Sequence, residues 1–179
     1  KQNIRDYLKR TWQNINKRTV WGLFIINILV FVILYGSYLS YFPLLMEERM
    51  EASALKIGLF MSGFSVVTAT TSSRLKQINR LLIPKVQIYI GISLYMISMI
   101  ILSFVSREWH LIFPLITFGL AHGVLIPRIQ TLLVGFAPLR ERAGFMSINS
   151  MILRLGQTTG PVLAGVFYLL DGISSAFLG

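Results

Sequence analysis

Long runs of apolar residues alternate along the chain with short clusters of charged residues. The runs cover about residues 20–45, 54–73, 86–105, 111–134 and 143–170, and another begins at residue 173. Each full run reaches the ~20 residues that a helix needs to cross the ~30 Å hydrocarbon core of a bilayer. The pattern predicts an all-α fold, a polytopic transmembrane helix bundle with five full spans and the start of a sixth.

Composition agrees with a chain whose main partner is the lipid bilayer. Of the 179 residues, 54% are hydrophobic and 13% are charged, against about 25% charged in a soluble domain. The net charge of +10 would suit a nucleic-acid-binding protein. However, the basic residues lie between the apolar runs and are not interleaved with aromatic residues along a groove, so nucleic acid is not an expected partner.

The charged clusters predict how the spans are oriented. If the N-terminus of this segment is cytoplasmic, the inner segments hold twelve basic residues, the outer loops hold three, and five of the seven acids lie outside. Lys and Arg favour the cytoplasmic side, so this bias supports that orientation in a cell membrane. The inner residues are Lys1, Arg5, Lys9, Arg10, Lys17, Arg18, Arg74, Lys76, Arg80, Lys85, Arg140 and Arg142, and the outer ones are Arg49, Lys56 and Arg107.

Residues 1–19 hold six basic residues and one acid, with Ile4, Leu8, Trp12 and Ile15 at helical spacing. This pattern predicts a cytoplasmic basic amphipathic linker that lies on an anionic leaflet. A solvated linker is the alternative. The chain begins with Lys1 and stops at Gly179, a few residues into the sixth run, so we expect a piece of a longer protein.

The fifth run combines a polar face with a face of small residues. At about 100° per residue, its polar residues and Pro161 fall within one arc, and Gly156, Gly160 and Ala164 form a ridge opposite. Small residues four apart let helix backbones approach closely in membranes. We therefore expect this helix to pack on one side and to face a water-filled cavity on the other. The polar arc contains Ser147, Ser150, Arg154, Gln157, Thr158 and Pro161.

Three other runs carry similar faces, whereas residues 86–105 are apolar all round and are predicted to face lipid. Tyr41 would serve equally well as an anchor at the membrane interface. The shared faces are Asn27, Leu34, Tyr38 and Tyr41; Gly58, Ser62, Ser65, Ala69 and Ser72; and Gly119, His122, Gly123, Ile126 and Gln130. The resulting cavity candidates are Asn27, Tyr38, Tyr41, Ser62, Ser65, His122, Gln130, Ser150, Arg154, Gln157 and Thr158.

Ionisable residues inside the runs are the candidates for chemistry, and none of them is an acid. His122 is the one titratable residue suited to carrying a proton, although it would also serve as a hydrogen bond between helices. Arg154 either contacts an anionic group across the cavity or pairs with a polar group of its own bundle. Arg128 is expected to extend to the cytoplasmic headgroups.

Several stretches in order resemble the C-terminal six-helix half of a major facilitator superfamily transporter of the drug-efflux branch. The glycine-proline stretch is similar to a motif of drug–proton antiporters, which implies packing and rocking roles for Gly156, Gly160, Pro161 and Gly165. Gly119, Gly123 and Ala164 are expected to pack similarly. The loop Ser73–Arg80 lacks the aspartate of the family's gating motif. The matching stretches are Tyr35–Pro43, Lys56–Phe60, Gly119–Pro127, Pro138–Arg142, Ser147–Asn149 and Arg154–Gly165.

The resemblance implies a secondary active transporter that works by alternating access, with the N-terminal six-helix half, a small-molecule substrate and protons as partners. Proton-coupled efflux of small molecules or drugs is the first hypothesis. An uptake carrier for a small organic anion and a non-transporting scaffold or receptor are the alternatives. The absence of cysteine, of metal-spaced ligands and of a phosphate-binding loop argues against an enzyme, and we expect no cofactor and no metal.

Overall fold

A computed structural model of the chain describes residues 12–178. Helices make up most of this part, which contains no strand, so the all-α prediction is confirmed. The elements are α2 (Arg18–Ile33), η1 (Leu34–Tyr41), α3 (Phe42–Met50), α4 (Ala54–Ser73), α5 (Leu75–Leu81), α6 (Pro84–Phe104), η2 (Glu108–Leu111), α7 (Ile112–Phe136), α8 (Arg142–Asp171) and α9 (Ser175–Leu178).

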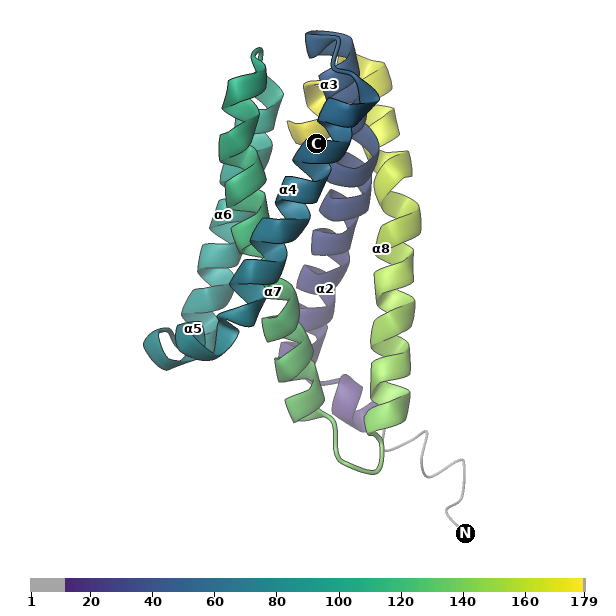
Figure 1. The fold of residues 1–179 in the computed structure, drawn as a ribbon. Helices are drawn as coiled ribbons and strands as arrows, with labels where there is room; N and C mark the ends of the chain where they lie inside the picture. The colour runs from purple at the N-terminus through teal and green to yellow at the C-terminus, as the bar shows by residue number, and fades with distance from the viewer. Residues whose placement is uncertain (1–11, 179) are drawn as a thin grey trace.

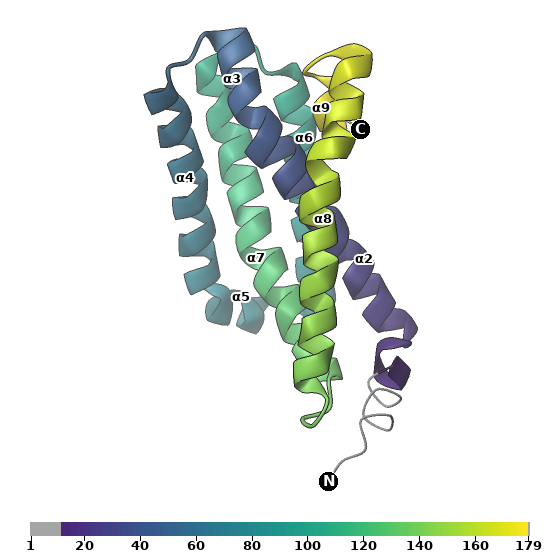
Figure 2. The same ribbon diagram turned by 90° about the vertical axis from the view of Figure 1, so that its right-hand side faces the viewer.

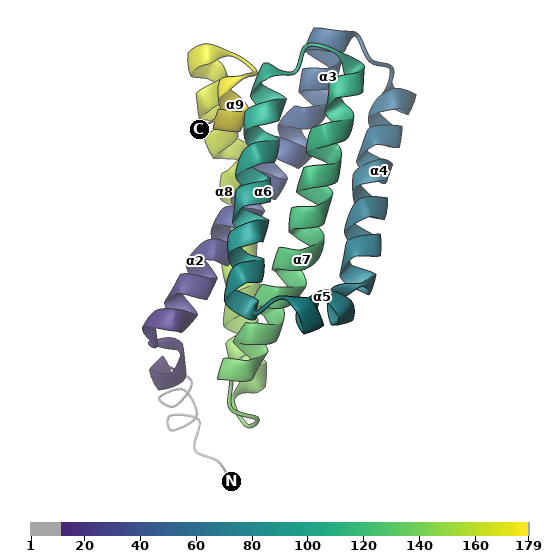
Figure 3. The same ribbon diagram turned by 90° about the vertical axis from the view of Figure 1, so that its left-hand side faces the viewer.

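The long helices lie roughly along one axis and form two groups side by side (Figures 1 and 2). In one group α7 packs against α4 on one side and α6 on the other, and Figure 3 shows these three helices in a row. In the other group α8 packs along α2 and η1, and α9 turns back against α8. Contacts of α2 with α7 and of α6 with α9 join the groups.

Four of the described helical segments are long and apolar enough to cross a membrane: Arg18–Met50, Ala54–Ser73, Pro84–Phe104 and Glu108–Phe136. We expected five full spans, and α8 does not meet the same criterion. At 30 residues it is about 45 Å long, which is sufficient length. Its polar stripe is what lowers the hydrophobic average of the helix.

The first span differs from the prediction in length and in geometry. It continues without a break to Met50, so the expected loop at residues 46–51 is mostly helical. The helix ends at Glu51, which adopts a left-handed conformation with φ 48°. Its middle part, η1, is a π-helix of eight residues, in which backbone hydrogen bonds link residues five apart.

Two further segments differ from simple connections. The basic loop expected after the second span contains the short helix α5, which has no buried residue. Of the linker predicted at residues 1–19, residues 1–11 lie outside the described part. Residues 12–15 form a helical turn, and Ile15 is buried while Trp12 is exposed.

Aromatic rings fill the junction between the two groups of helices. Tyr38 of η1 lies 4.5 Å from Phe64 of α4 and 4.6 Å from Phe118 of α7, measured between ring centroids. Tyr95 of α6 meets Phe118 edge-on at 4.7 Å. Because aromatic rings bury large apolar areas and favour such offset or edge contacts, this cluster fixes how the groups pack.

Candidate functional site

The polar stripe of α8 is exposed on the side of the helix away from its packing face. Ser147, Ser150 and Thr158 are all exposed, and each hydroxyl donates a hydrogen bond to the carbonyl four residues earlier in the same helix. These bonds satisfy the hydroxyl donors locally, as is usual for Ser and Thr within helices. Arg154 and Gln157 are therefore the side chains of the stripe that are available to reach outward.

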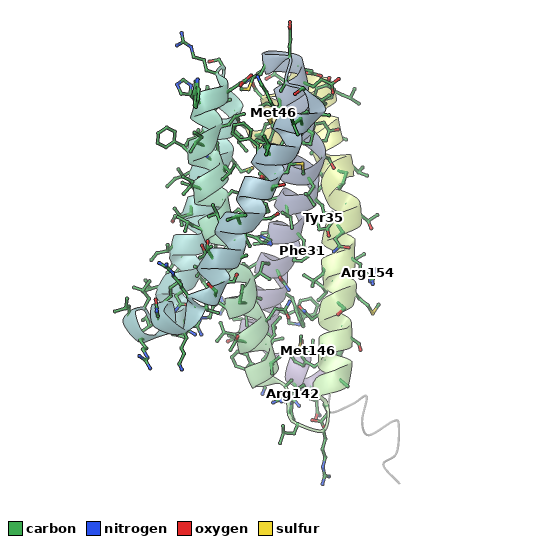
Figure 4. The ribbon with its side chains drawn as sticks, viewed as in Figure 1. Phe31, Tyr35, Met46, Arg142, Met146 and Arg154 are labelled. Carbon is green, nitrogen blue, oxygen red and sulfur yellow. The ribbon has the colours of Figure 1, made fainter. Side chains whose placement is uncertain are left out.

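Arg154 points away from the other helices of the bundle (Figure 4). Its side chain is exposed, and within residues 12–178 no carboxylate pairs with it. Both sequence hypotheses for Arg154 invoked a partner, and neither partner lies in the described part of the chain.

An aromatic pair on α2 and η1 lies next to the polar stripe. The rings of Phe31 and Tyr35 stack with centroids 5.9 Å apart, and Gln157 donates a hydrogen bond of 3.2 Å to the Tyr35 hydroxyl. Figure 4 shows both rings on the face between α4 and α8. Sequence reasoning did not select this pair, although aromatic residues four apart on a helix are a recognisable signal.

Three amide side chains connect three helices in the interior. Asn27 of α2 donates a 2.8 Å bond to Asn149 of α8, which donates a 3.2 Å bond to Gln130 of α7. Asn27 and Asn149 are fully buried, so both lie behind the exposed face and not on it. The side-chain oxygen of Asn27 has no partner in the described structure. Asn27, Asn149 and Gln130 thus link the two groups of helices through hydrogen bonds, and we call these three residues the amide joint.

Tyr38 and His122 also lie deeper than expected. Tyr38 is 1% exposed within the aromatic cluster, and its hydroxyl is buried without a hydrogen bond among residues 12–178. His122 is half-buried, stacks on Phe118, and shares a 2.5 Å hydrogen bond between its Nδ1 and the hydroxyl of Tyr95. The structure therefore gives His122 the interhelical hydrogen bond that was the alternative hypothesis.

The glycines lie where helix backbones approach each other. A Cβ added at Gly160 would lie 2.6 Å from the carbonyl oxygen of Val32, and one at Gly156 would lie 2.8 Å from that of Ile28. In the other group, added carbons at Gly119 and Gly123 would meet α4 side chains at 2.7 and 2.6 Å. A Cβ added at Gly36 of η1 would likewise lie 2.6 Å from the carbonyl oxygen of Gly160, so both groups contain positions where only glycine fits without movement.

The remaining candidates are scattered over the surface. Ser62 and Ser65 are exposed on α4, and Ser65 bonds its own helix. Tyr41 contacts the ring of Tyr168 at 5.5 Å, and its hydroxyl lies 2.9 Å from where a Cβ of Gly165 would be. Pro161 lies within the continuous helix α8, and Ala164 is buried. The structure thus brings Gln157, Tyr35 and Phe31 together but leaves the α4 serines apart from them.

Arg128 differs from its expected position. It is 8% exposed and does not extend to solvent. Its Nε donates to Gln87 at 2.7 Å, and its Nη2 donates to Asn79 at 2.5 Å. Two neutral amides, one from α6 and one from α5, hold this guanidinium group.

A cavity of about 350 Å³ lies on the other side of α8 from the polar stripe. Its lining is mostly apolar and comes from α2, η1, α6, α8 and α9, including Leu29, Met99, Leu163 and Phe177. Phe31, Tyr35, Arg154 and Gln157 do not line this cavity. The candidate site is therefore the group of Phe31, Tyr35 and Gln157 together with Arg154, which lies on the exposed stripe of α8 one turn from Gln157 and points outward; we call these four residues the polar face.

The chain is similar in sequence to known proteins over most of its length. The chain is 25% identical over 165 residues to the protein named "Multidrug resistance protein MdtG" from Salmonella arizonae and equally to that from Salmonella newport. The aligned region is 90% of this chain but 41% of each relative, so the chain spans about two fifths of their length. No solved structure matches the chain.

The family assignment rests on a second comparison. The sequence model of the Major Facilitator Superfamily matches residues 84–179, which is more than half of the chain. That region includes α6, α7 and α8, which carry Gln130 and Asn149 of the amide joint, four of the five close-approach glycines described above, and Arg154. The apolar helices and the relatives agree with a multi-pass membrane protein. The chain belongs to the Major Facilitator Superfamily.

Proposed function

We propose that this chain is the C-terminal half of a secondary active transporter that exports small molecules in exchange for protons. The observation that carries the proposal is the division of the exposed side of α8. Arg154 and Thr158 are exposed on one stripe, while Leu155 and Val162 are exposed beside them. Because an intramembrane charge costs about 2.5 kcal/mol or more, the polar stripe is expected to face water or protein in the intact transporter.

The chemistry of the polar face favours an amphipathic substrate with a flat ring. Phe31 and Tyr35 offer stacked aromatic surface, and Gln157 and Arg154 offer hydrogen-bond donors. The relatives are named multidrug resistance proteins, which supports efflux as the direction. No acid occurs within the apolar runs of the sequence, and Glu47, Glu48 and Glu108 lie at the ends of the membrane-crossing segments, so a carboxylate for a cationic substrate or for proton coupling would come from the other half.

The glycine contacts support a mechanism in which packed helices move as units. Gly156 and Gly160 hold α8 against α2, and Gly119 and Gly123 hold α7 against α4. Tight backbone contact resists sliding of one helix past its neighbour. Alternating access by rocking of one half against the other would use this half as a nearly rigid body.

The test uses the full-length protein in proteoliposomes with an imposed pH gradient, while candidate drugs are added one at a time. Drug-dependent dissipation of the gradient is the expected result. Replacing His122 with Ala tests whether this half carries the proton, and Tyr95→Phe tests whether the hydrogen bond to His122 contributes. Failure of every drug to dissipate the gradient would overturn proton-coupled efflux.

The uptake of a small organic anion is the second candidate, and the exposed guanidinium of Arg154 favours it. If this candidate is right, labelled organic anions accumulate in the proteoliposomes, and Arg154→Gln abolishes the accumulation while Arg154→Lys retains part of it. If the protein is a scaffold or receptor, neither assay detects movement of any solute.

A further inference from the structure

The short helix α5 and its flanks form a basic surface at one end of the bundle. Arg74, Lys76, Arg80 and Lys85 are all exposed, and the segment of residues 74–85 contains no acid. Leu81 and Ile83 lie among them with 83% and 65% of their surface exposed. We call residues 74–85 the α5 surface. Exposed basic residues beside exposed apolar residues are typical of a segment at the lipid headgroup level.

This surface continues into an apolar strip on α6. Tyr89, Ile90 and Ile97 are exposed along the helix that follows directly from the α5 surface. Figure 1 shows α5 lying across the lower end of α4 and α6, so acyl chains could run along α6 from headgroups at α5. Tyrosine near the end of an apolar helix is a common anchor at the membrane interface.

Hydrogen bonds among Asn79, Gln87 and Arg128 hold the α5 surface against the bundle, and we call these three residues the clamp. The Oδ1 of Asn79 accepts hydrogen bonds from Arg128 at 2.5 Å and from Gln87 at 3.1 Å. Gln87 also donates to the carbonyl of Leu82 at 2.8 Å. Because α5 buries no residue of its own, these bonds determine where its basic side chains lie.

The clamp adds a further positive charge beneath the surface. Arg128 is largely buried, and no carboxylate in the described part of the chain pairs with its guanidinium group. A charge with only neutral partners leaves the local potential positive, and the exposed basic residues increase it. The chemistry that complements this potential, together with the adjacent apolar strip, is an anionic headgroup attached to acyl chains.

We propose that the α5 surface is a binding site for an anionic phospholipid. Lys76, Arg80 and Lys85 contact the headgroup phosphate, the acyl chains lie along Leu81, Ile83 and α6, and Asn79 and Arg128 position α5. The site is independent of the transported substrate and of the direction of transport.

Native mass spectrometry of the full-length protein, titrated with phosphatidylglycerol or phosphatidylcholine, tests the proposal. The paired variant Lys76→Gln/Arg80→Gln removes two charges from the site. Arg140→Gln/Arg142→Gln is the matched control, because it removes two exposed charges at the start of α8, on either side of Glu141. Each basic residue near an anionic surface strengthens binding about fivefold, so the first pair should weaken phosphatidylglycerol binding roughly 30-fold.

The control pair should leave phosphatidylglycerol binding nearly unchanged, and phosphatidylcholine binding should be weak throughout. Equal losses in both pairs would mean general electrostatic attraction and would overturn the site, as would equal binding of the two lipids. Asn79→Ala keeps every basic residue but removes the clamp's acceptor. It should weaken phosphatidylglycerol binding and speed amide hydrogen exchange in residues 75–81; no change in either would exclude the positioning role.

Discussion

Two arginines within the apolar helices carry the same charge in different surroundings. Arg128 is buried and donates to two amide oxygens, whereas Arg154 is exposed on the polar stripe of α8. Burying a charge is tolerated when its donors are satisfied, and amide acceptors do this without introducing a second charge. Arg128 is therefore part of the internal structure of this chain, and Arg154 is the arginine whose side chain is exposed to contact groups outside it.

The amide joint yields a prediction for Asn149. Replacing Asn149 with Ala removes the acceptor for Asn27 and the donor to Gln130, and should lower the free energy of unfolding by about 0.6–1.7 kcal/mol, the range for interhelical hydrogen bonds in membranes. Thermal unfolding in detergent measures the loss. In a double-mutant cycle with Asn27→Ala, the two changes should be non-additive; simple additivity would show that the bond contributes nothing.

A second prediction concerns Gly160, where a Cβ would lie 2.6 Å from the carbonyl oxygen of Val32. Gly160→Ala should separate α8 from α2 and destabilise the protein by about 1–3 kcal/mol, the usual cost of overpacking. Gly22→Ala on α2 is the control, because nothing lies within 4 Å of its added carbon. That control should be neutral or slightly stabilising. An equally mild effect at Gly160 would contradict the close contact.

The sequence predicts on which face of a helix a residue lies better than it predicts which distant residues that residue contacts. The ridge of Gly156, Gly160 and Ala164 was predicted from spacing within one helix, and these residues do lie on the packed side of α8. The partners of Arg128 lie 41 and 49 residues away in the chain, and helical periodicity carries no information about contacts at that distance. Arg128 therefore looked like a residue that would extend to headgroups.

At the scale of elements, Arg49 joins three helix ends. From the last turn of α3 it donates bonds of 3.1 and 2.9 Å to the carbonyls of Ser103 and Val105, and it also contacts the hydroxyl of Ser174. The two carbonyls belong to the C-terminal end of α6, where backbone acceptors lack partners within the helix. A guanidinium there satisfies them and complements the helix dipole.

Arg49→Ala should therefore fray the end of α6 and lower the free energy of unfolding by about 1.5–3 kcal/mol, as expected for hydrogen bonds to a charged group. Hydrogen exchange should quicken in residues 100–105 and around residue 174. Arg107→Ala removes an exposed arginine near the same end and should leave the exchange unchanged. If both variants exchange alike, Arg49 does not act as the cap.

Element geometry also explains which faces were predicted correctly. The face of α8 followed from about 100° per residue, because α8 is one continuous α-helix. The same rule placed Asn27, Tyr38 and Tyr41 on one face of the first span. Residues 34–41 form a π-helix, which takes more residues per turn, so the rule fails across them. No feature of the apolar pattern distinguishes a π-helical stretch from an α-helical one.

At the scale of the whole molecule, the two groups of helices meet through rings and amides. The rings of Tyr38, Phe64 and Phe118 join them at one level, and the joint of Asn27, Asn149 and Gln130 joins them at another. The polar face lies beside this junction, on α2, η1 and α8. A packed junction behind an open polar face agrees with our proposal that this chain moves as one unit during transport.

Orientation is the property of the whole molecule that can be tested most directly, because this chain contains no cysteine. In a full-length protein without other cysteines, Glu51→Cys and Arg107→Cys mark one end of the bundle, and Arg80→Cys and Arg142→Cys mark the other. All four positions are exposed. The excess of basic residues at the second end predicts that it is cytoplasmic. An impermeant maleimide should label the first pair in intact cells and the second pair only after permeabilisation; the reverse pattern would invert the topology and place the α5 surface outside.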